Sequence, residues 1–510
     1  MTAPADVIFT NAEVHTLADT DETAEAVAVR DGEIVRVDNA YEVDFLEGVE
    51  TEVIDLGGRV LLPGFIDAHT HMMMVGSYLV NADLSVADSP ADCVELLAEL
   101  DADREWVLGY GFDESMWTES RYLTRDDLDS VSETRPVVAF REDMHTASIN
   151  SVALARLRDV MPDEDVETEG SEPTGVVVED AVDAIYEAIE PDAETMRELL
   201  RSAQRDVHEK GITGVHDMVR RSRAPEVYRA LELDGDLALR VRINYWSDHI
   251  DAVEEIGLQT NHGSEFVRTG AIKSFTDGSF GGRTAKLSEP YADGDGTGQW
   301  VVPPEELDEL VERADDAGMQ FTAHAIGDEA IEATLDAFEE TDDPGAKRHR
   351  VEHVELVTDD QVERFAESGV VASVQPNFLK WAQEGGLYDT RLGEERRKRT
   401  NRYRTLLDAG AYLAFGSDCM PLDPLFGIHQ TVNAPVEAQR LGVTEALRAY
   451  THGGAYAGFD ENRLGTVERG KKADFVVLDV SPWEHEDHIE NIDVAMTVVD
   501  GTVVFDGRND

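Results

Sequence analysis

Lysine and cysteine are scarce in this sequence, and long apolar stretches are missing from it. Lysine occupies eight positions, so 36 of the 44 basic residues are arginine. The two cysteines, Cys93 and Cys419, lie far apart and cannot form the framework of a small disulfide-rich protein. No run approaches the roughly 18 apolar residues of a membrane-spanning helix, and the first residues lack the basic start and apolar core of a secretory signal. We therefore expect a cytoplasmic protein without a membrane partner.

Charge of one sign dominates the composition. Acidic residues outnumber basic ones by 107 to 44, which gives a net charge of -63. Such a surface repels nucleic acids and anionic membranes, so we expect neither as a partner. The acids are spread along the chain and 42% of residues are hydrophobic, which favours a folded protein. The charge is typical of halophilic proteins, and in this background a lysine within an apolar strand is unusual.

The length of 510 residues allows a large domain with smaller ones. Residues 1–60 and 465–510 alternate apolar and polar side chains between turn residues, which predicts one β-domain built from both ends of the chain. Residues 61–464 alternate short apolar runs with helical patterns, as in parallel α/β proteins. The long gap after the first run predicts an inserted subdomain at about 80–205.

Eight strand-like runs in the middle of the chain predict a closed (β/α)8 barrel. These runs are 60–71, 212–218, 239–246, 270–276, 319–325, 350–355, 369–375 and 412–418. Helical patterns lie between them, for example at 195–209, 304–317, 359–367 and 443–450.

Residues that can bind a metal fall at the carboxyl ends of these runs. His69 and His71 are two positions apart and therefore share one face of a strand. Such a pair alone is more often two surface or hydrogen-bonded histidines than a metal site. The corresponding ends of later runs carry Lys273, His324, His353 and Asp418. In a parallel barrel these ends meet at one rim, so the sequence predicts a metal site there.

The sequence resembles the amidohydrolase superfamily, and within it amidohydrolase family 3, which includes N-substituted formamide deformylases. The motifs that carry this resemblance are PGFIDAHTH, GVHDM, IKSFTDGSFGGRTA, AHAIGD, VEHVEL, SVQPNF, FGSDCMP and LGTVERGKKADFVVLD. They span nearly the whole chain. The resemblance implies a (β/α)8 TIM barrel, a composite β-sandwich from the two ends of the chain, and an insertion after the first strand.

The resemblance also implies a divalent metal centre, for which we expect zinc and one or two ions per chain. His69 and His71, with Asp418, would hold one ion, whereas His324 and His353 would hold a second.

Lys273 matches a lysine that many members carboxylate so that it bridges two ions. The chemistry requires a neutral amine, and burial favours that form. The alternatives are an ordinary lysine that pairs with Asp277 or another acid, and a site with a single ion.

Asp418 is the expected catalytic base, which accepts a proton from water and delivers it to the leaving nitrogen. We expect a small-molecule substrate with an amide or formamide-type C–N bond. Hydrolysis of a cyclic amide or lactone, or deamination, is the alternative. A non-catalytic scaffold is less favoured because the six polar residues are all present. The sequence leaves a homo-oligomer open.

Some further residues have predicted roles near the site. Asp328 is expected to orient the imidazole at the end of the fifth run. His216 is expected to pack in the core rather than to bind metal. His145 and Asn150 resemble the family's insertion motif near the substrate, and Arg283 is a candidate pocket residue.

Overall fold

The computed structural model describes residues 3–18, 22–100, 104–114, 117–142 and 146–508. The chain forms two compact units. The first contains Met1–His71, Gln204–Arg221 and Tyr228–Asp510, and the second contains Met72–Ala203 and Ser222–Val227.

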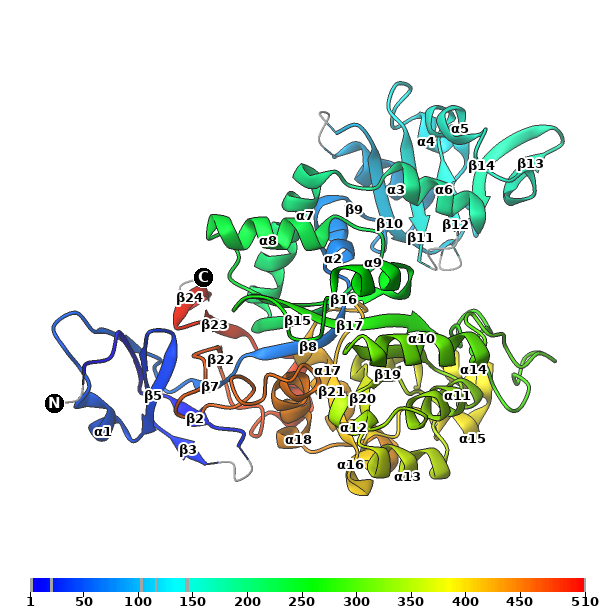
Figure 1. The fold of residues 1–510 in the computed structure, drawn as a ribbon. Coiled ribbons are helices and arrows are strands. Elements are labelled where there is room, and N and C mark those ends of the chain that lie inside the picture. Colours follow the sequence, from blue (N-terminus) through cyan, green and yellow to red (C-terminus); the bar gives the residue numbers. More distant parts are fainter. Residues whose placement is uncertain (1–2, 19–21, 101–103, 115–116, 143–145, 509–510) are drawn as a thin grey trace. The chain divides into compact units, whose positions relative to one another are not determined.

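A barrel of eight parallel strands forms the centre of the first unit (Figure 1). Its strands, in hydrogen-bonded order, are β8 (Phe65–Thr70), β15 (Ile212–Val219), β16 (Arg240–Trp246), β17 (Val267–Phe275), β18 (Gln320–Ala325), β19 (Arg350–His353), β20 (Val371–Val374) and β21 (Tyr412–Phe415). Each predicted run overlaps one of these strands, so the predicted (β/α)8 barrel is confirmed. Nearly every strand residue is buried, because side chains fill the interior and helices cover the outside.

Helices alternate with the barrel strands along the chain (Figure 1). They are α7 (Ala193–Glu209), α8 (Ala224–Asp234), α9 (Ile250–Ile256), α10 (Pro304–Asp316), α11 (Asp328–Glu339), α12 (Pro344–Lys347), α13 (Asp359–Ser368), α14 (Leu387–Leu392), α15 (Glu394–Arg397), α16 (Tyr403–Ala409), α17 (Pro424–Val432), α18 (Val443–Arg448) and α19 (Gly454–Ala457). Helix α10 shows why they pack: Leu307, Val311 and Ala314 are spaced by four and three residues and form its buried stripe.

The barrel closes between its first strand, β8, and its last strand, β21, through contacts made just after the end of β21. Asp67 Oδ1 accepts hydrogen bonds from the N–H groups of Ser417 (3.1 Å) and His69 (3.0 Å). The N–H of Asp418 donates to the carbonyl of His69 (2.8 Å). A Cβ on Gly416 would lie 2.5 Å from His69 N, so the approach requires glycine. This seam therefore places the end of the eighth strand beside His69.

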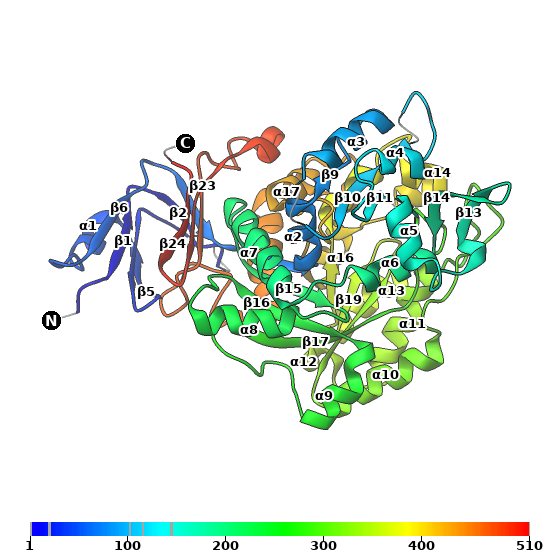
Figure 2. The same cartoon turned by 90° about the horizontal axis from the view of Figure 1, so that it is seen from above.

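Two further sheets of the first unit contain the ends of the chain. One has the order β5-β4-β1-β6 and the other β24-β23-β22-β7-β2-β3. The elements are β1 (Val7–Thr10), β2 (Glu13–His15), β3 (Thr23–Ala24), β4 (Ala26–Arg30), β5 (Glu33–Asp38), α1 (Ala40–Asp44), β6 (Glu52–Asp55), β7 (Val60–Pro63), β22 (Phe475–Leu478), β23 (Val494–Val499) and β24 (Thr502–Asp506). Figure 2 shows the early and late strands together, and a shared core joins Phe9, Leu61 and Phe475.

The predicted strand at 60–71 is in fact two strands, because its hydrogen-bond partners change at Gly64. Strand β7 pairs with β22 of the second terminal sheet, whereas β8 pairs with β15 of the barrel. The N–H of Gly64 donates to Asp474 O and that of Phe65 to Gly211 O. One apolar run therefore serves both sheets.

The second unit is built on a six-stranded mixed sheet, β13-β14-β12-β11-β10-β9, that the sequence reading did not recognise. Its elements are α2 (Met72–Val80), β9 (Ala82–Asp83), α3 (Pro90–Ala98), β10 (Val107–Phe112), α4 (Arg125–Asp129), β11 (Val137–Arg141), β12 (Thr146–Ile149), α5 (Ser151–Leu157), β13 (Val166–Glu169), β14 (Glu172–Val178) and α6 (Asp180–Ala188). It begins directly after His71 rather than near residue 80.

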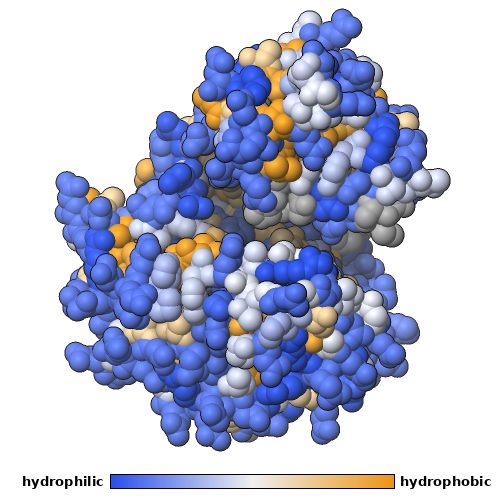
Figure 3. Space-filling view, turned by 90° about the vertical axis from the view of Figure 1, so that its right-hand side faces the viewer, coloured by the Kyte–Doolittle hydropathy of each residue, from blue (hydrophilic) through white to orange (hydrophobic). Residues whose placement is uncertain are grey.

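The surface reflects the acidic composition. The face shown in Figure 3 is covered largely by hydrophilic residues. Within the described residues, no helix combines the length and the apolar character needed to cross a membrane.

Replacement of Asp474 by alanine is predicted to destabilise the first unit. Arg240, at the start of β16, is buried and makes two hydrogen bonds with Asp474, of 2.5 and 2.9 Å. Loss of one partner from a buried ion pair costs about 3–5 kcal/mol when the other charge is left uncompensated. Here Arg240 keeps a second pair with Asp500 (3.1 Å), so we expect a loss at or below the lower end of that range. Denaturant unfolding at fixed salt measures the loss. The matched control is Asp251→Ala, whose exposed pair with Arg313 should leave the midpoint unchanged; equal midpoints for both variants would contradict the prediction.

Candidate metal centre

His69, His71 and Asp418 form a group at the carboxyl-terminal rim of the barrel. One ligand atom from each lies within 4.8 Å of the other two. The Nε2 atoms of His69 and His71 are 3.6 and 3.3 Å from Asp418 Oδ1. His69 is in β8 and His71 is the first residue after it, so both imidazoles come from the end of this strand, and the seam brings Asp418 to them. The structure thus brings together three predicted ligands.

The outer ring nitrogens of both histidines are held by acceptors. His69 Nδ1 lies 2.6 Å from Glu352 Oε2, and His71 Nδ1 lies 3.1 Å from the carbonyl of Met218. Carboxylates and carbonyls accept, so we assign the proton of each ring to Nδ1. The lone pairs on Nε2 then face Asp418, as in histidines that bind a metal.

Glu352 is a functional residue that the sequence reading missed. It is fully buried, forms an ion pair with Arg350 and accepts a hydrogen bond from Thr322. Burial alone would raise the pKa of Glu352, but Arg350 and His69 hold that pKa well below its usual range. A signal for it was present, because Arg350 and Glu352 are two residues apart in an apolar strand and so share its inner face.

His324 and His353 lie next to this group. Their ring centroids are 4.4 Å apart, and those of His353 and His69 are 5.0 Å apart. His324 Nε2 donates to the carbonyl of Gly278 (3.0 Å), so its Nδ1 offers a lone pair. His353 Nδ1 is buried and has no hydrogen-bond partner within the described chain. Both rings therefore have a nitrogen available to a cation.

Lys273 is buried in β17 and pairs with none of the described carboxylates. Its Nζ donates to the carbonyl of Ser274 (3.3 Å) and lies near the rings of Trp246 and Phe275. Burial lowers the pKa of Lys273 to about 8.

The alternative pairing of Lys273 with Asp277 is not seen. Asp277 instead accepts hydrogen bonds from the N–H groups of Lys286, Ile326 and Gly327 (2.8–3.0 Å).

The expectation that Asp328 orients His324 is wrong. Asp328 begins α11 and accepts hydrogen bonds from the N–H and hydroxyl of Ser288. The carboxylate near His324 Nε2 is Asp277, at 3.6 Å. Asp328 is close to His324 in the sequence, whereas Asp277, in the loop after β17, is close to it in space.

The structure gives local contacts for two of the three predicted substrate residues, Arg283 and Asn150. Arg283 lies in the loop after β17 and pairs with Asp293 (2.8 Å). Asn150, in the second unit, caps α5, and both ends of its amide bind backbone groups. His145 lies outside the described residues. Their contacts with substrate stay predictions.

The donor set fits a divalent cation. Zinc takes imidazole nitrogens and a carboxylate in a tetrahedral site and leaves one position open in catalytic centres. Burial alone would raise the pKa of Asp418, but His69 and His71 lower it, which keeps the carboxylate anionic. His69, His71 and Asp418 could hold one ion. His353 Nδ1, which has no hydrogen-bond partner among the described residues, could bind a second.

Comparison with known proteins agrees with this geometry. The putative amidohydrolase YtcJ of Bacillus subtilis is 31% identical over 97% of this chain and 98% of its own. The N-substituted formamide deformylase of Arthrobacter pascens is 27% identical over 99% of both chains. The crystal structure of an uncharacterized metal-dependent hydrolase from Pyrococcus furiosus superposes with a TM-score of 0.82 and 32% identity, and covers 94% of this chain and 99% of that one. Residues 52–505 match the sequence model of the amidohydrolase family. The chain therefore belongs to the amidohydrolase family, as its motifs had suggested.

Proposed function

We propose that this protein is a metal-dependent hydrolase that cleaves the C–N bond of a small amide or formamide. The observation that carries the proposal is the convergence of two imidazole Nε2 atoms on the Asp418 carboxylate at the barrel rim. Family membership supports hydrolysis, and the formamide deformylase among the relatives supports the bond class.

A bound divalent cation would lower the pKa of water and polarise a carbonyl oxygen. The side chains of the protein orient the ligands of this ion and transfer the proton. His69 and His71 hold their lone pairs toward the ion because Glu352 and the carbonyl of Met218 fix their protons. Asp418 Oδ1, beside both rings, accepts the proton of the attacking water and delivers it to the leaving nitrogen. The hydrogen bond from its N–H to His69 O keeps this carboxylate in place.

The environment of Lys273 supports a role for this residue as a bridge between two metal ions. Its buried amine lacks a carboxylate partner among the described residues, and at a pKa of about 8 part of it is neutral near pH 7. A neutral amine reacts with CO2 to form a carbamate, which is an anion that cations stabilise. We propose that Lys273 is carboxylated in the loaded enzyme and that zinc is the metal.

Loss of His71 is predicted to lower metal content. The variant His71→Ala removes one of three grouped ligands, so elemental analysis after dialysis should find clearly less divalent metal per chain. His488→Ala, which removes an exposed imidazole, is the control and should match the wild type. Unchanged stoichiometry in His71→Ala would exclude this residue as a ligand.

Asp418→Asn is predicted to retain most of the metal but to lose turnover. The amide can still ligate through oxygen but cannot accept a proton, so kcat should fall by about 10²–10⁴-fold. The assay uses the best substrate from a panel of N-formyl, N-acyl and cyclic amides. Asp408→Asn, at an exposed carboxylate, should turn over normally. Wild-type turnover in Asp418→Asn with full metal would remove this residue from the base role.

Carboxylation of Lys273 predicts a carbamate carbon resonance when the metal-loaded protein is incubated with 13C-bicarbonate. Lys273→Arg should abolish the resonance, because a guanidinium does not form the carbamate. Lys286→Arg, which changes a lysine paired with Glu329, should keep it. If the metal-loaded wild-type protein lacked the resonance, Lys273 would be an ordinary amine and the prediction would be wrong.

A further inference from the structure

A line of four buried polar side chains runs through the barrel interior, away from the rim. His69 Nδ1 is 2.6 Å from Glu352 Oε2, and Glu352 Oε1 is 2.7 Å from Arg350 Nη2. Arg350 Nη1 is 2.8 Å from His216 Nδ1. All four are at most 4% exposed, and they come from strands β8, β19 and β15.

The proton positions along this line follow from chemistry. A guanidinium only donates, so His216 Nδ1 must accept and its proton lies on Nε2. The Glu352 carboxylate accepts on both oxygens, so His69 carries its proton on Nδ1 and presents Nε2 to the rim. Each member therefore fixes the orientation of the next.

Arg350 is the centre of this arrangement. Its Nη2 donates its two protons to the carbonyl of Ala68 (2.6 Å) and to Ser373 Oγ (2.9 Å), and its charge pairs with Glu352. Ala68 precedes His69 in β8, so one guanidinium holds both the backbone beside His69 and the carboxylate that holds its ring. Movement of Arg350 would disturb both supports.

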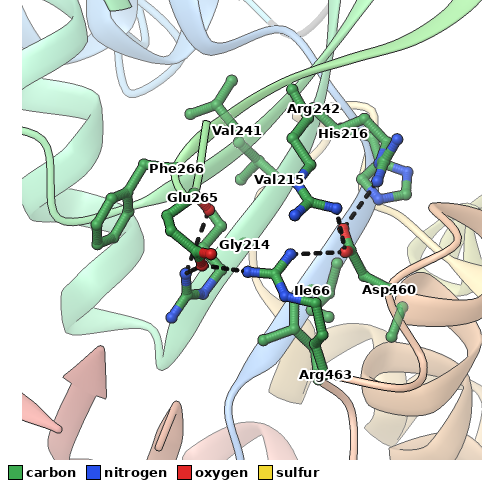
Figure 4. Close-up of a pocket in the computed structure, with 14 residues that line it drawn as sticks. Ile66, Gly214, Val215, His216, Val241, Arg242, Glu265, Phe266, Asp460 and Arg463 are labelled. Atoms are coloured by element: carbon green, nitrogen blue, oxygen red, sulfur yellow. Dashed lines mark hydrogen bonds and ion pairs between the residues drawn. The ribbon is translucent and has the colours of Figure 1, made fainter. Parts of the chain in front are cut away.

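His216 anchors the far end. It lines a small cavity of about 30 Å³ near the amino ends of β15 and β16, together with Arg242 and Asp460 (Figure 4). Arg242 pairs with Asp460 at 2.8 Å. A Cβ on Gly458 would lie 2.9 Å from His216 Nε2, so the chain after α19 closes tightly over the ring. Packing thus prevents His216 from turning away from Arg350.

We propose that Glu352, Arg350 and His216 are positioning residues that fix the tautomer and direction of His69, with His216 as the anchor at the far end of this line. The proposal rests on the proposed metal site, of which His69 is a ligand. It extends that site to residues that the predicted ligand set does not include.

The test measures zinc affinity by competition with a chromophoric chelator, together with the visible spectrum of the cobalt-loaded protein. Glu352→Gln should weaken zinc binding by about 10–100-fold, the usual effect of losing the partner of a ligating histidine. His216→Leu, which removes the acceptor of Arg350, should also weaken it and alter the cobalt spectrum. His216→Asn keeps an acceptor near the place of Nδ1 and should restore both.

The matched control is His349→Leu. His349 is also fully buried and accepts a hydrogen bond, from the N–H of Phe321, but it lies outside the line. Its loss should lower stability without changing zinc affinity or the cobalt spectrum. Equal effects of His349→Leu and His216→Leu would overturn the proposal, as would wild-type affinity in His216→Leu.

Nitrogen NMR of the histidine rings tests the same proposal without a substitution. The wild-type metal-free protein should show the Nε2–H tautomer for His216 and the Nδ1–H tautomer for His69, and the reverse would overturn the proposal. Failure of the proposed metal site is distinguishable, because zinc would then bind His69→Ala as tightly as it binds the wild type.

Discussion

The buried ion pair of Arg350 and Glu352 is the interaction on which the interior of the barrel depends. Both side chains are fully buried, and a charge taken out of water is costly unless it is paired and hydrogen-bonded. The barrel meets this requirement with neighbours from three other strands: His69, Ser373 and His216. An apolar interior would stabilise the barrel at least as well, but it could not hold an imidazole in one tautomer.

This constraint connects the fold with the chemistry. A closed parallel barrel brings the carboxyl ends of its strands to one rim, so ligands from distant parts of the chain meet without a special loop. The rim alone does not decide which nitrogen of a histidine faces inward. That choice comes from Glu352 for His69 and from the carbonyl of Met218 for His71. Both acceptors belong to barrel strands, and strands are more rigid supports than loops.

The sequence predicted what depends on strand periodicity and chain order. It located all eight barrel strands because each is a short apolar run, and it singled out the polar residues that lie in or just after several of these runs. Glu352 escaped prediction because its partner His69 is 283 positions away and no local pattern joins the two. The sequence suggests Asp328 as the partner of His324 because it lies four residues away in the chain, whereas the fold brings Asp277 to within 3.6 Å of His324 Nε2.

The strand pairing at the first run and the sheet of the second unit depend on contacts rather than on pattern. The break at Gly64 is invisible in an uninterrupted apolar run, since both halves are buried strands. The strands of the second unit are short and are interrupted by helices of similar length, so neither periodicity extends far enough to be recognised.

The number of ions and the state of Lys273 are linked by charge. His69, His71 and Asp418 form a complete group for one cation, with one carboxylate to balance it. His324 and His353 bring two neutral imidazoles, and the carboxylate near them, Asp277, is already bound to three backbone N–H groups. A protonated lysine beside them would repel a second cation, whereas a carbamate would supply both the missing ligand and the missing negative charge. We therefore infer that a second ion would bind together with the modified lysine, whereas an ordinary lysine at position 273 would favour a single ion.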